Sequence, residues 1–286
     1  MPPLWLYLAS LDMMAWGVGQ VLVKRATDRL GAVTMVLFVT LVDGGMYLGI
    51  FLLAAQPLAA SLSTYVYASL AAAVGITGYV LYFEALRRGS VSVVATITAG
   101  SPIVTIVGAL LFLGEIPTLA QAVGMALLVT TILVLSYEPV GLEWKVPVAV
   151  TLSVVILFLW GAWGIFTKVA VDAPGFGPWQ MLVFYSASNF VAGVPYYLWR
   201  RKRFPPPDPS RAAYGMGLAG FLLLMGGIVA STVALSIGDA SLVTAVGGCA
   251  PVVTSLVAFT FLKEKATIPR VVALALFVPG IVLVAF

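Results

Sequence analysis

The sequence predicts an all-α polytopic membrane protein in which ten transmembrane helices form two inverted five-helix repeats. Three observations predict this fold class: the composition, the number of long apolar runs and an internal duplication. Hydrophobic residues make up 62% of the 286 residues, charged residues make up 9%, and the mean hydropathy is +1.09. A typical soluble domain is roughly 45 to 50% apolar and about 25% charged. The composition therefore places the chain in a lipid bilayer.

Ten apolar runs are long enough to cross a membrane, because a helix needs roughly 20 apolar residues to span the hydrocarbon core. They cover residues 4–23, 32–55, 63–86, 90–113 and 118–137, followed by 147–171, 178–199, 213–236, 239–262 and 267–286. We expect residues 1–137 to form the first repeat, 138–146 a linker loop and 147–286 the second repeat, all within one integrated domain. The proline-rich stretch 200–211 is expected to be a stiff extended connector.

The duplication is clearest where residues 85–118 match residues 234–267 without a gap, with 13 of the 34 positions identical. The matches that are not simply aliphatic include Gly89/Gly238, Ser92/Ser241, Pro102/Pro251, Thr105/Thr254, Glu115/Glu264 and Thr118/Thr267. The first helices also match, since Trp16-Gly17 followed by Lys24 recurs as Trp160-Gly161 followed by Lys168. Five spans per copy is an odd number, so the second copy must be inverted in the membrane.

The basic residues predict the orientation. Of the 15 Lys and Arg residues, all but Lys168 fall on one side of the predicted topology. Basic loops stay in the cytoplasm, so both termini are expected outside, on the periplasmic or extracellular face of a cytoplasmic (inner) membrane. The formal charge of +4 therefore reflects topology and does not indicate a nucleic-acid partner.

These repeated motifs resemble the drug/metabolite transporter superfamily, specifically its EamA-like ten-helix branch. The resemblance covers essentially the whole chain. It rests on Trp-Gly and Lys at the end of the first helix of each half, and on Pro followed by Glu in the fourth. It implies an alternating-access secondary carrier with a central cavity, often an exporter of amino acids or related metabolites. It also implies cytoplasmic termini, which disagrees with the charge distribution, and we follow the charges.

Two carboxylates near the bilayer midplane are the leading candidates for binding substrate or protons. Asp12 and Asp43 lie near the centres of the first and second spans, and no Lys or Arg lies at comparable depth. A carboxylate there costs roughly 2.5 to 3.5 kcal/mol on insertion scales, so it usually faces a cavity and serves a function. Either acid would suit proton-coupled exchange or binding of a substrate ammonium group. Hydrogen bonding that only packs helices together is the alternative.

Aromatic and polar residues complete the candidate binding site. Trp16 lies four residues after Asp12 and shares its helical face, and Trp163 lies at comparable depth in the other half. Rings around an acid can bind a cation, although ordinary packing stays open as an alternative. Asn189 aligns with Asp43, whereas Ile156 aligns with Asp12. Weaker candidates on the same grounds are Gln20, Tyr79, Tyr82 and Tyr185.

Two prolines near the centres of the fourth and ninth spans are expected to kink their helices, because proline lacks a backbone donor. They are Pro102 and Pro251. The carbonyl groups freed near Thr98, Ser101 and Gly247 are expected to line the cavity. A kink that serves packing and a kink that serves as a hinge are equally open.

The remaining charges have structural interpretations. Glu84 precedes Arg87 and Arg88 by three and four residues, which allows ion pairs within the helix. Glu115 and Glu264 close equivalent helices on opposite faces, as scaffold residues that could also gate the pathway. Lys24 and Lys168 are expected to snorkel to the membrane interface.

The predicted function is a secondary active transporter that exports a small amino-acid-like, cationic or zwitterionic metabolite by alternating access, driven by the proton gradient. A multidrug or organic-cation exporter of the same fold is the alternative. An intramembrane enzyme is disfavoured because the chain has no His, a single Cys and no acid pair at metal-ligand spacing. A channel is disfavoured because no re-entrant filter loop is visible. We expect no cofactor, no metal and no nucleic-acid partner, and a monomer can form the whole pathway.

Overall fold

The computed structural model describes residues 2–89, 91–136, 148–261 and 268–285. Within these ranges the chain folds into helices and short connections, without any strand. The expected linker 138–146 lies outside them, as do Glu264 and Thr267 of the duplicated segment. The predicted fold class, an all-α polytopic membrane protein of ten spans in two inverted repeats, is confirmed.

The elements follow the predicted spans closely. The first half contains α1 (Leu4–Phe38), the π-helical segment η1 (Val39–Asp43), α2 (Gly44–Ala54), α3 (Leu62–Arg88), α4 (Val91–Thr98), α5 (Ser101–Phe112) and α6 (Leu119–Ser136). The second half contains α7 (Val148–Val171), α8 (Pro178–Arg200), α9 (Arg211–Leu235), α10 (Ala240–Gly247), α11 (Ala250–Phe261) and α12 (Ile268–Ala285). Among the described residues, five helical segments are both long and apolar enough to cross a membrane, and the longest, Leu4–Ala54, holds the first two predicted spans.

The connection between the first two spans is much shorter than expected. We expected a loop over residues 24–31, but α1 continues through Leu30 and only Gly31 leaves the helical conformation, with φ 74° and ψ 156°. Glycine adopts such a positive φ without steric cost, so a single residue can turn the chain back. Lys24 and Arg25 consequently lie on the last turns of a helix and not in a loop.

The predicted fourth and ninth spans are each divided into two helices. The first breaks between Thr98 and Ser101, and the second breaks between Gly247 and Ala250. In both cases the proline is the second residue of the new helix. Because proline cannot donate to the carbonyl four residues earlier, the hydrogen-bond ladder stops there. The expected kinks are therefore complete interruptions.

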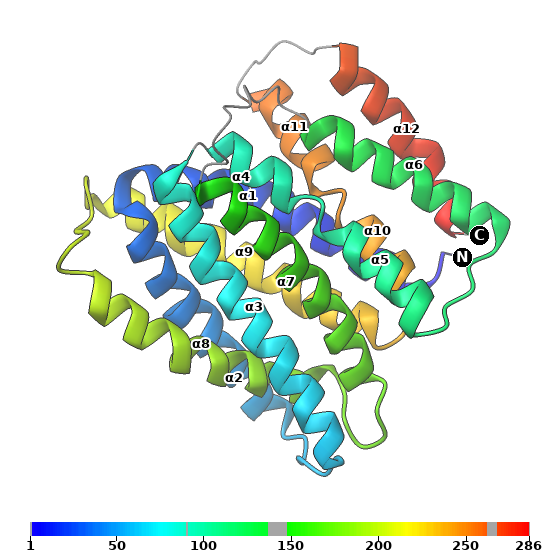
Figure 1. Cartoon of the computed structure of the whole chain (residues 1–286), viewed down its shortest axis with the longest axis horizontal. Helices are drawn as coiled ribbons and strands as arrows, with labels where there is room; N and C mark the ends of the chain where they lie inside the picture. The colour runs from blue at the N-terminus through cyan, green and yellow to red at the C-terminus, as the bar shows by residue number, and fades with distance from the viewer. Residues whose placement is uncertain (1, 90, 137–147, 262–267, 286) are drawn as a thin grey trace.

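Each main pair of packed helices combines one helix from each repeat. α1 packs on α9 and α3 packs on α7, while α2 packs on α8 and α6 packs on α12 (Figure 1). Since α7 is the repeat of α1, and α9 is the repeat of α3, the first two contacts are equivalent. Such a pattern is what two intertwined inverted repeats produce.

Glycines bring paired backbones into near contact. A β-carbon placed on Gly19 of α1 would lie 3.1 Å from the carbonyl oxygen of Gly220 in α9. One placed on Gly124 of α6 would lie 2.9 Å from the carbonyl oxygen of Gly280 in α12. Small residues at helix interfaces permit this close packing inside a membrane.

The bundle has two distinct ends. One end, here called the terminal face, carries both chain termini and the connections 55–61, 113–118, 172–177 and 236–239 (Figure 1). The other end, the basic face, carries Lys24, Arg25, Arg29, Arg87, Arg88, Arg200, Arg201, Lys202, Arg203 and Arg211. The expected assignment of the basic face to the cytoplasm stays a prediction.

The proline-rich connector at the basic face is only partly extended. Instead of a stiff extended segment throughout, it begins with a turn, in which the amides of Arg203 and Phe204 donate to the carbonyl of Arg200. Further along, the amide of Asp208 donates to the carbonyl of Arg29 at 2.7 Å. The connector is thus fastened to α1 two residues before Gly31.

Candidate functional site

A cavity of about 630 Å³ lies between the two halves and is lined by helices from both. Lys24, Arg25 and Asp28 line it at the basic face, and Asp12 and Asp43 line its interior. None of the described residues in the connections of the terminal face contributes to its wall. The cavity therefore opens at one end only, and its volume is within the range of small-molecule sites.

Every binding-site and cavity residue predicted from the sequence lines this cavity. They are Asp12, Trp16, Gln20, Asp43, Tyr79, Tyr82, Thr98, Ser101, Pro102, Trp163, Tyr185, Asn189 and Pro251. The structure thus brings together residues from seven of the ten spans. The binding roles assigned to these residues stay predictions.

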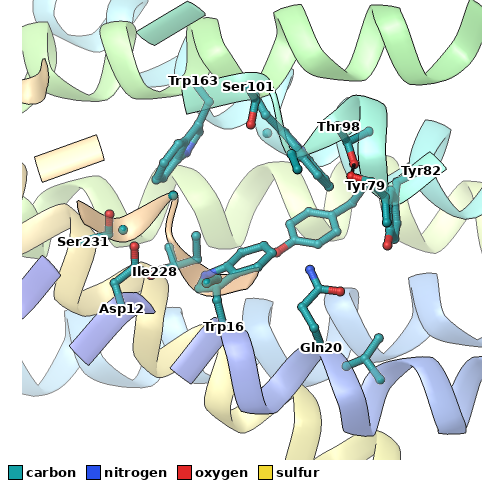
Figure 2. A pocket seen from close by; sticks show the side chains of 18 of the residues that line it. Asp12, Trp16, Gln20, Tyr79, Tyr82, Thr98, Ser101, Trp163, Ile228 and Ser231 are labelled. Carbon is teal, nitrogen blue, oxygen red and sulfur yellow. Dashed lines mark hydrogen bonds between the residues drawn. The ribbon is translucent and has the colours of Figure 1, made fainter. Parts of the chain in front are cut away.

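Asp12 occupies a small niche formed by α9 and the end of α10. A β-carbon on Gly227 would lie 2.9 Å from Asp12 Oδ1, and one on Gly247 would lie 2.7 Å from Oδ2. Ser231 lies beside the carboxylate (Figure 2), where its hydroxyl can donate a hydrogen bond to it. The Asp12 side chain is 8% exposed, and its Oδ1 has no hydrogen-bond partner among the described residues. We call Asp12, Gly227, Ser231 and Gly247 the Asp12 niche.

An aromatic wall runs from this niche toward the mouth of the cavity. Trp16, one turn after Asp12, stacks on Tyr79 with 6.4 Å between ring centroids and 23° between planes. Trp160 then packs against Tyr79 and Tyr82 at 5.5 and 5.4 Å. Figure 2 shows Gln20 pointing toward the same rings from the next turn of α1. The rings come from three different helices, so the wall depends on the packing of both repeats.

A second aromatic group lies on α2, α7 and α8. The ring centroid of Tyr185 lies 5.8 Å from that of Tyr47 and 6.1 Å from that of Trp163. The Tyr185 hydroxyl shares a hydrogen bond of 2.8 Å with Thr167. Tyr185 is thereby fixed in orientation at the cavity wall.

Asp43 ends the π-helical segment η1, a feature that is frequent at functional sites. Its side chain is 2% exposed, and Oδ1 has no hydrogen-bond partner among the described residues. The equivalent residue of the other repeat, Asn189, donates from Nδ2 to the carbonyl of Val39 at 3.2 Å. Asn189 thus holds the start of the segment that carries Asp43, a supporting contact that the sequence did not predict.

The two interrupted spans meet at the centre of the cavity wall. A β-carbon on Gly248, after α10, would contact the ring of Pro102 in α5. Thr98 lines the cavity, but its hydroxyl donates to the carbonyl of Val94 at 2.9 Å within its own helix. The breaks in the two spans therefore lie next to each other.

Comparison with known proteins agrees with the repeated architecture. The model of the EamA-like transporter family matches residues 3–137 and again residues 147–286. The chain belongs to the EamA-like transporter family. The resemblance found in the sequence is thereby confirmed, and members of this family are membrane transporters.

Solved structures share the fold of this EamA-like protein. A crystal structure of a protein aligns over 98% of this chain and 95% of its own, with a TM-score of 0.75 and 15% sequence identity. At that identity the likeness concerns the fold alone. No curated protein matches the chain in sequence.

Contacts between the EamA repeats and within the second repeat hold helices together at the terminal face. Glu115 accepts hydrogen bonds from the amides of Ala240 at 2.7 Å and Ser241 at 2.9 Å, so it caps the first turn of α10. Lys168 donates to the carbonyl of Leu235, the last residue of α9, and to Asp172, both at 2.9 Å. The snorkelling predicted for Lys168 stays a prediction; its side chain is 13% exposed and is held by protein groups at this face.

The described counterpart of the Lys168 contact is not formed at the basic face. Lys24 and Asp28 correspond to Lys168 and Asp172, but both are more than half exposed and their charged atoms are 3.6 Å apart. Leu86, the equivalent of Leu235, lines the cavity together with Lys24, and no hydrogen bond joins them in the described structure. Glu264, the equivalent of Glu115, lies outside the described residues.

The ion pairs predicted for Glu84 are confirmed, and the cluster is larger than expected. Arg87 lies 2.8 Å and Arg88 3.5 Å from Glu84 Oε2. Its other oxygen accepts from the Tyr196 hydroxyl and from Arg200, both at 2.6 Å. The cluster ties α3 to α8 at the basic face and stands apart from the cavity.

Sequence reasoning missed three residues of the site: Tyr47, Gly227 and Ser231. The pairing of α1 with α9, which brings the last two to Asp12, cannot be read from hydropathy. One signal was available, because the repeat alignment places Ser231 opposite Tyr82, which was already a candidate.

Proposed function

We propose that this EamA-like protein is a secondary active transporter that exports a small cationic or zwitterionic metabolite in exchange for protons. The observation that carries the proposal is a cavity of about 630 Å³ that opens at one face and holds two buried carboxylates, Asp12 and Asp43. Neither carboxylate is within ion-pair distance of a described Lys or Arg. A carboxylate in that setting usually serves transport.

Alternating access is supported by the unequal ends of the two repeats. Inverted repeats give the two faces equivalent contact residues, and among the described ones the Lys168 contact with Leu235 is made whereas its counterpart between Lys24 and Leu86 is not. If the repeats exchanged conformations, Lys24 would donate to the carbonyl of Leu86 as Lys168 now does to Leu235. The basic face would then close and the terminal face would open.

Coupling to protons follows from the two acids. A carboxyl group that is shielded from water can hold a proton or a cationic substrate, and competition between them produces exchange. Because the basic face is proposed to be cytoplasmic, the described conformation would load substrate from the cytoplasm. The direction of transport is then export across the cytoplasmic membrane. A monomer, with no cofactor beyond the proton gradient, suffices for this cycle.

Reconstitution into proteoliposomes containing a pH-sensitive dye tests this function. Amino acids, polyamines and organic cations are added one at a time, and the proton flux that each drives is recorded. We expect at least one of them to drive proton flux in the wild type, and Asp12→Asn and Asp43→Asn to abolish that flux. Asp208→Asn, at an exposed carboxylate of the connector, is the matched control and should behave as wild type. If both interior variants transported with an unchanged pH response, the proposed role of the acids would be wrong.

One observation favours the alternative, a multidrug or organic-cation exporter. The wall formed by Trp16, Tyr79, Tyr82 and Trp160 could bind a bulky cation through its ring faces. A metabolite exporter and an organic-cation exporter would differ in the chemical group of the substrate that contacts Asp12.

A further inference from the structure

We propose that the Asp12 niche binds the primary ammonium group of an organic amine that carries no carboxylate of its own. The inference rests on the proposed function, in that it takes the cavity as the substrate site. It goes further by naming the chemical group that binds at one place in the cavity, and by separating amines from both zwitterionic amino acids and quaternary cations.

The niche offers three hydrogen-bond acceptors. Asp12 Oδ1 is buried and has no partner among the described residues. The Ser231 hydroxyl, when it donates to the carboxylate, keeps lone pairs that can accept a hydrogen bond. Asp12 Oδ2 also keeps a lone pair after accepting one hydrogen bond. A primary ammonium group has three N–H donors and no acceptor, so its demand matches this supply.

The niche is narrow. The backbones of Gly227 and Gly247 approach the Asp12 carboxylate so closely that even a β-carbon would lie within 3 Å of it. A nitrogen that carries only hydrogens needs the least room beside the carboxylate and can form hydrogen bonds at normal distances. Methyl groups on a quaternary nitrogen would hold the positive charge away from the carboxylate and leave all three acceptors unpaired.

The niche is present in only one of the two repeats. The positions equivalent to Asp12, Ser231 and Gly247 hold Ile156, Tyr82 and Thr98. Larger or apolar side chains thus occupy three of the four corresponding positions in the other half. The fourth position is the same in both halves, since Gly78 is the equivalent of Gly227. A small oxygen-lined niche in one half only is not a requirement of the shared scaffold.

The surroundings of Asp12 favour a ligand with a net positive charge. Asp12 lies beside the C-terminal end of α10, which carries partial negative charge. The other described carboxylate of the interior, Asp43, adds to it. The described cations of the cavity wall, Lys24 and Arg25, lie roughly 18 Å or more along α1 from Asp12, at about 1.5 Å per residue. The carboxylate of a bound α-amino acid would lie next to Asp12 without a neutralising partner, so a net positive amine is favoured.

Two matched pairs of probes test the proposal on the purified full-length protein. Cadaverine and lysine differ only by the carboxylate, and pentylamine and pentyltrimethylammonium differ only by the methyl groups on nitrogen. Binding is measured through the fluorescence of the tryptophans that line the cavity. We expect cadaverine to bind about 10-fold or more tightly than lysine, and pentylamine about 10-fold or more tightly than pentyltrimethylammonium, since each comparison removes or disrupts a charge-assisted interaction.

Variants then assign the binding to the niche. Gly247→Ala places a methyl group against the Asp12 carboxylate and should weaken pentylamine binding about 10-fold or more. Gly226→Ala is the matched control, because a β-carbon there meets no atom within 4 Å, and it should bind as wild type. If Gly247→Ala does not fold, Ser231→Ala removes one acceptor without adding bulk and should weaken binding several-fold.

The results separate this proposal from the carrier role. Equal affinity for cadaverine and lysine, equal affinity for the two pentyl probes, or no binding of any probe would each overturn the amine assignment. The carrier role would survive any of these results if another compound still drove proton flux that Asp12→Asn and Asp43→Asn abolish. Loss of the carrier role would instead appear as an unchanged flux in both variants.

Discussion

The hydroxyl of Thr105 donates a hydrogen bond of 2.9 Å to the carbonyl oxygen of Gly161. The repeat of this contact joins Thr254 to the carbonyl of Gly17 at 3.0 Å. Each threonine lies on the helix that begins at the repeated proline, and each glycine belongs to the Trp-Gly motif of the other repeat. The repeated threonine and the repeated Trp-Gly glycine therefore hydrogen-bond to each other, and the two repeats form this contact twice.

Substituting Gly161 by Ala should destabilise the protein, because a β-carbon there would clash with Val104 Cβ in α5. Overpacking of this kind typically costs about 1 to 3 kcal/mol. The measurement is thermal unfolding in detergent, with Gly45→Ala as control, since a β-carbon on Gly45 meets no atom within 4 Å. Equal melting temperatures for the two variants would show that the close approach of α5 and α7 is not required.

Removing the Lys168 contact should open the terminal face. Spin labels are attached at Ile116 and Ile237, which are exposed in two connections of that face, in a background with Cys249 replaced by Ala. Lys168→Met should add a longer distance between the labels, because the bond to the Leu235 carbonyl is lost. Lys24→Met, the repeat-equivalent control, should leave the shorter distance dominant. Identical distance distributions for the two variants would contradict the proposed closure.

The Glu84 cluster should contribute to stability as a unit. The side chains of Glu84 and Arg200 are each about one-tenth exposed. Glu84→Gln removes the carboxylate that pairs with Arg200 and leaves the guanidinium group largely shielded from water. Breaking such a buried pair from one side typically costs about 3 to 5 kcal/mol. The double variant Glu84→Gln/Arg200→Gln should therefore lose less stability than the sum of the single variants. Additive losses in denaturant or thermal unfolding would refute the coupling.

Replacing Asp43 by Asn should separate proton coupling from substrate binding. Asn is the residue at the equivalent position of the other repeat, so the variant is expected to fold. Pentylamine binding, assigned to the Asp12 niche, should change little, whereas substrate-driven proton flux should fall to the level of protein-free vesicles. A variant that lost pentylamine binding but kept the flux would reverse the roles of the two acids.

The fold was largely predictable because each span leaves a long apolar run, and because proline forbids helix continuation at Pro102 and Pro251. The cavity residues were predictable since polar groups inside a membrane are costly and need a polar environment. The Asp12 niche was not, because Gly227 and Ser231 reach Asp12 only through the pairing of α1 with α9. The contact of Lys168 was equally hidden, because its partner is a backbone carbonyl that any residue at position 235 would supply.

The turn at Gly31 has a mechanical consequence. No loop separates the two parts of α1 on either side of Gly31. A shift of one part must therefore move the other. The amide of Asp208 donates a hydrogen bond to the carbonyl of Arg29, two residues before that turn. The connector between α8 and α9 is therefore expected to move with this part of α1. A displacement of α1 at the basic face would consequently be transmitted from the first repeat to the second through this hydrogen bond.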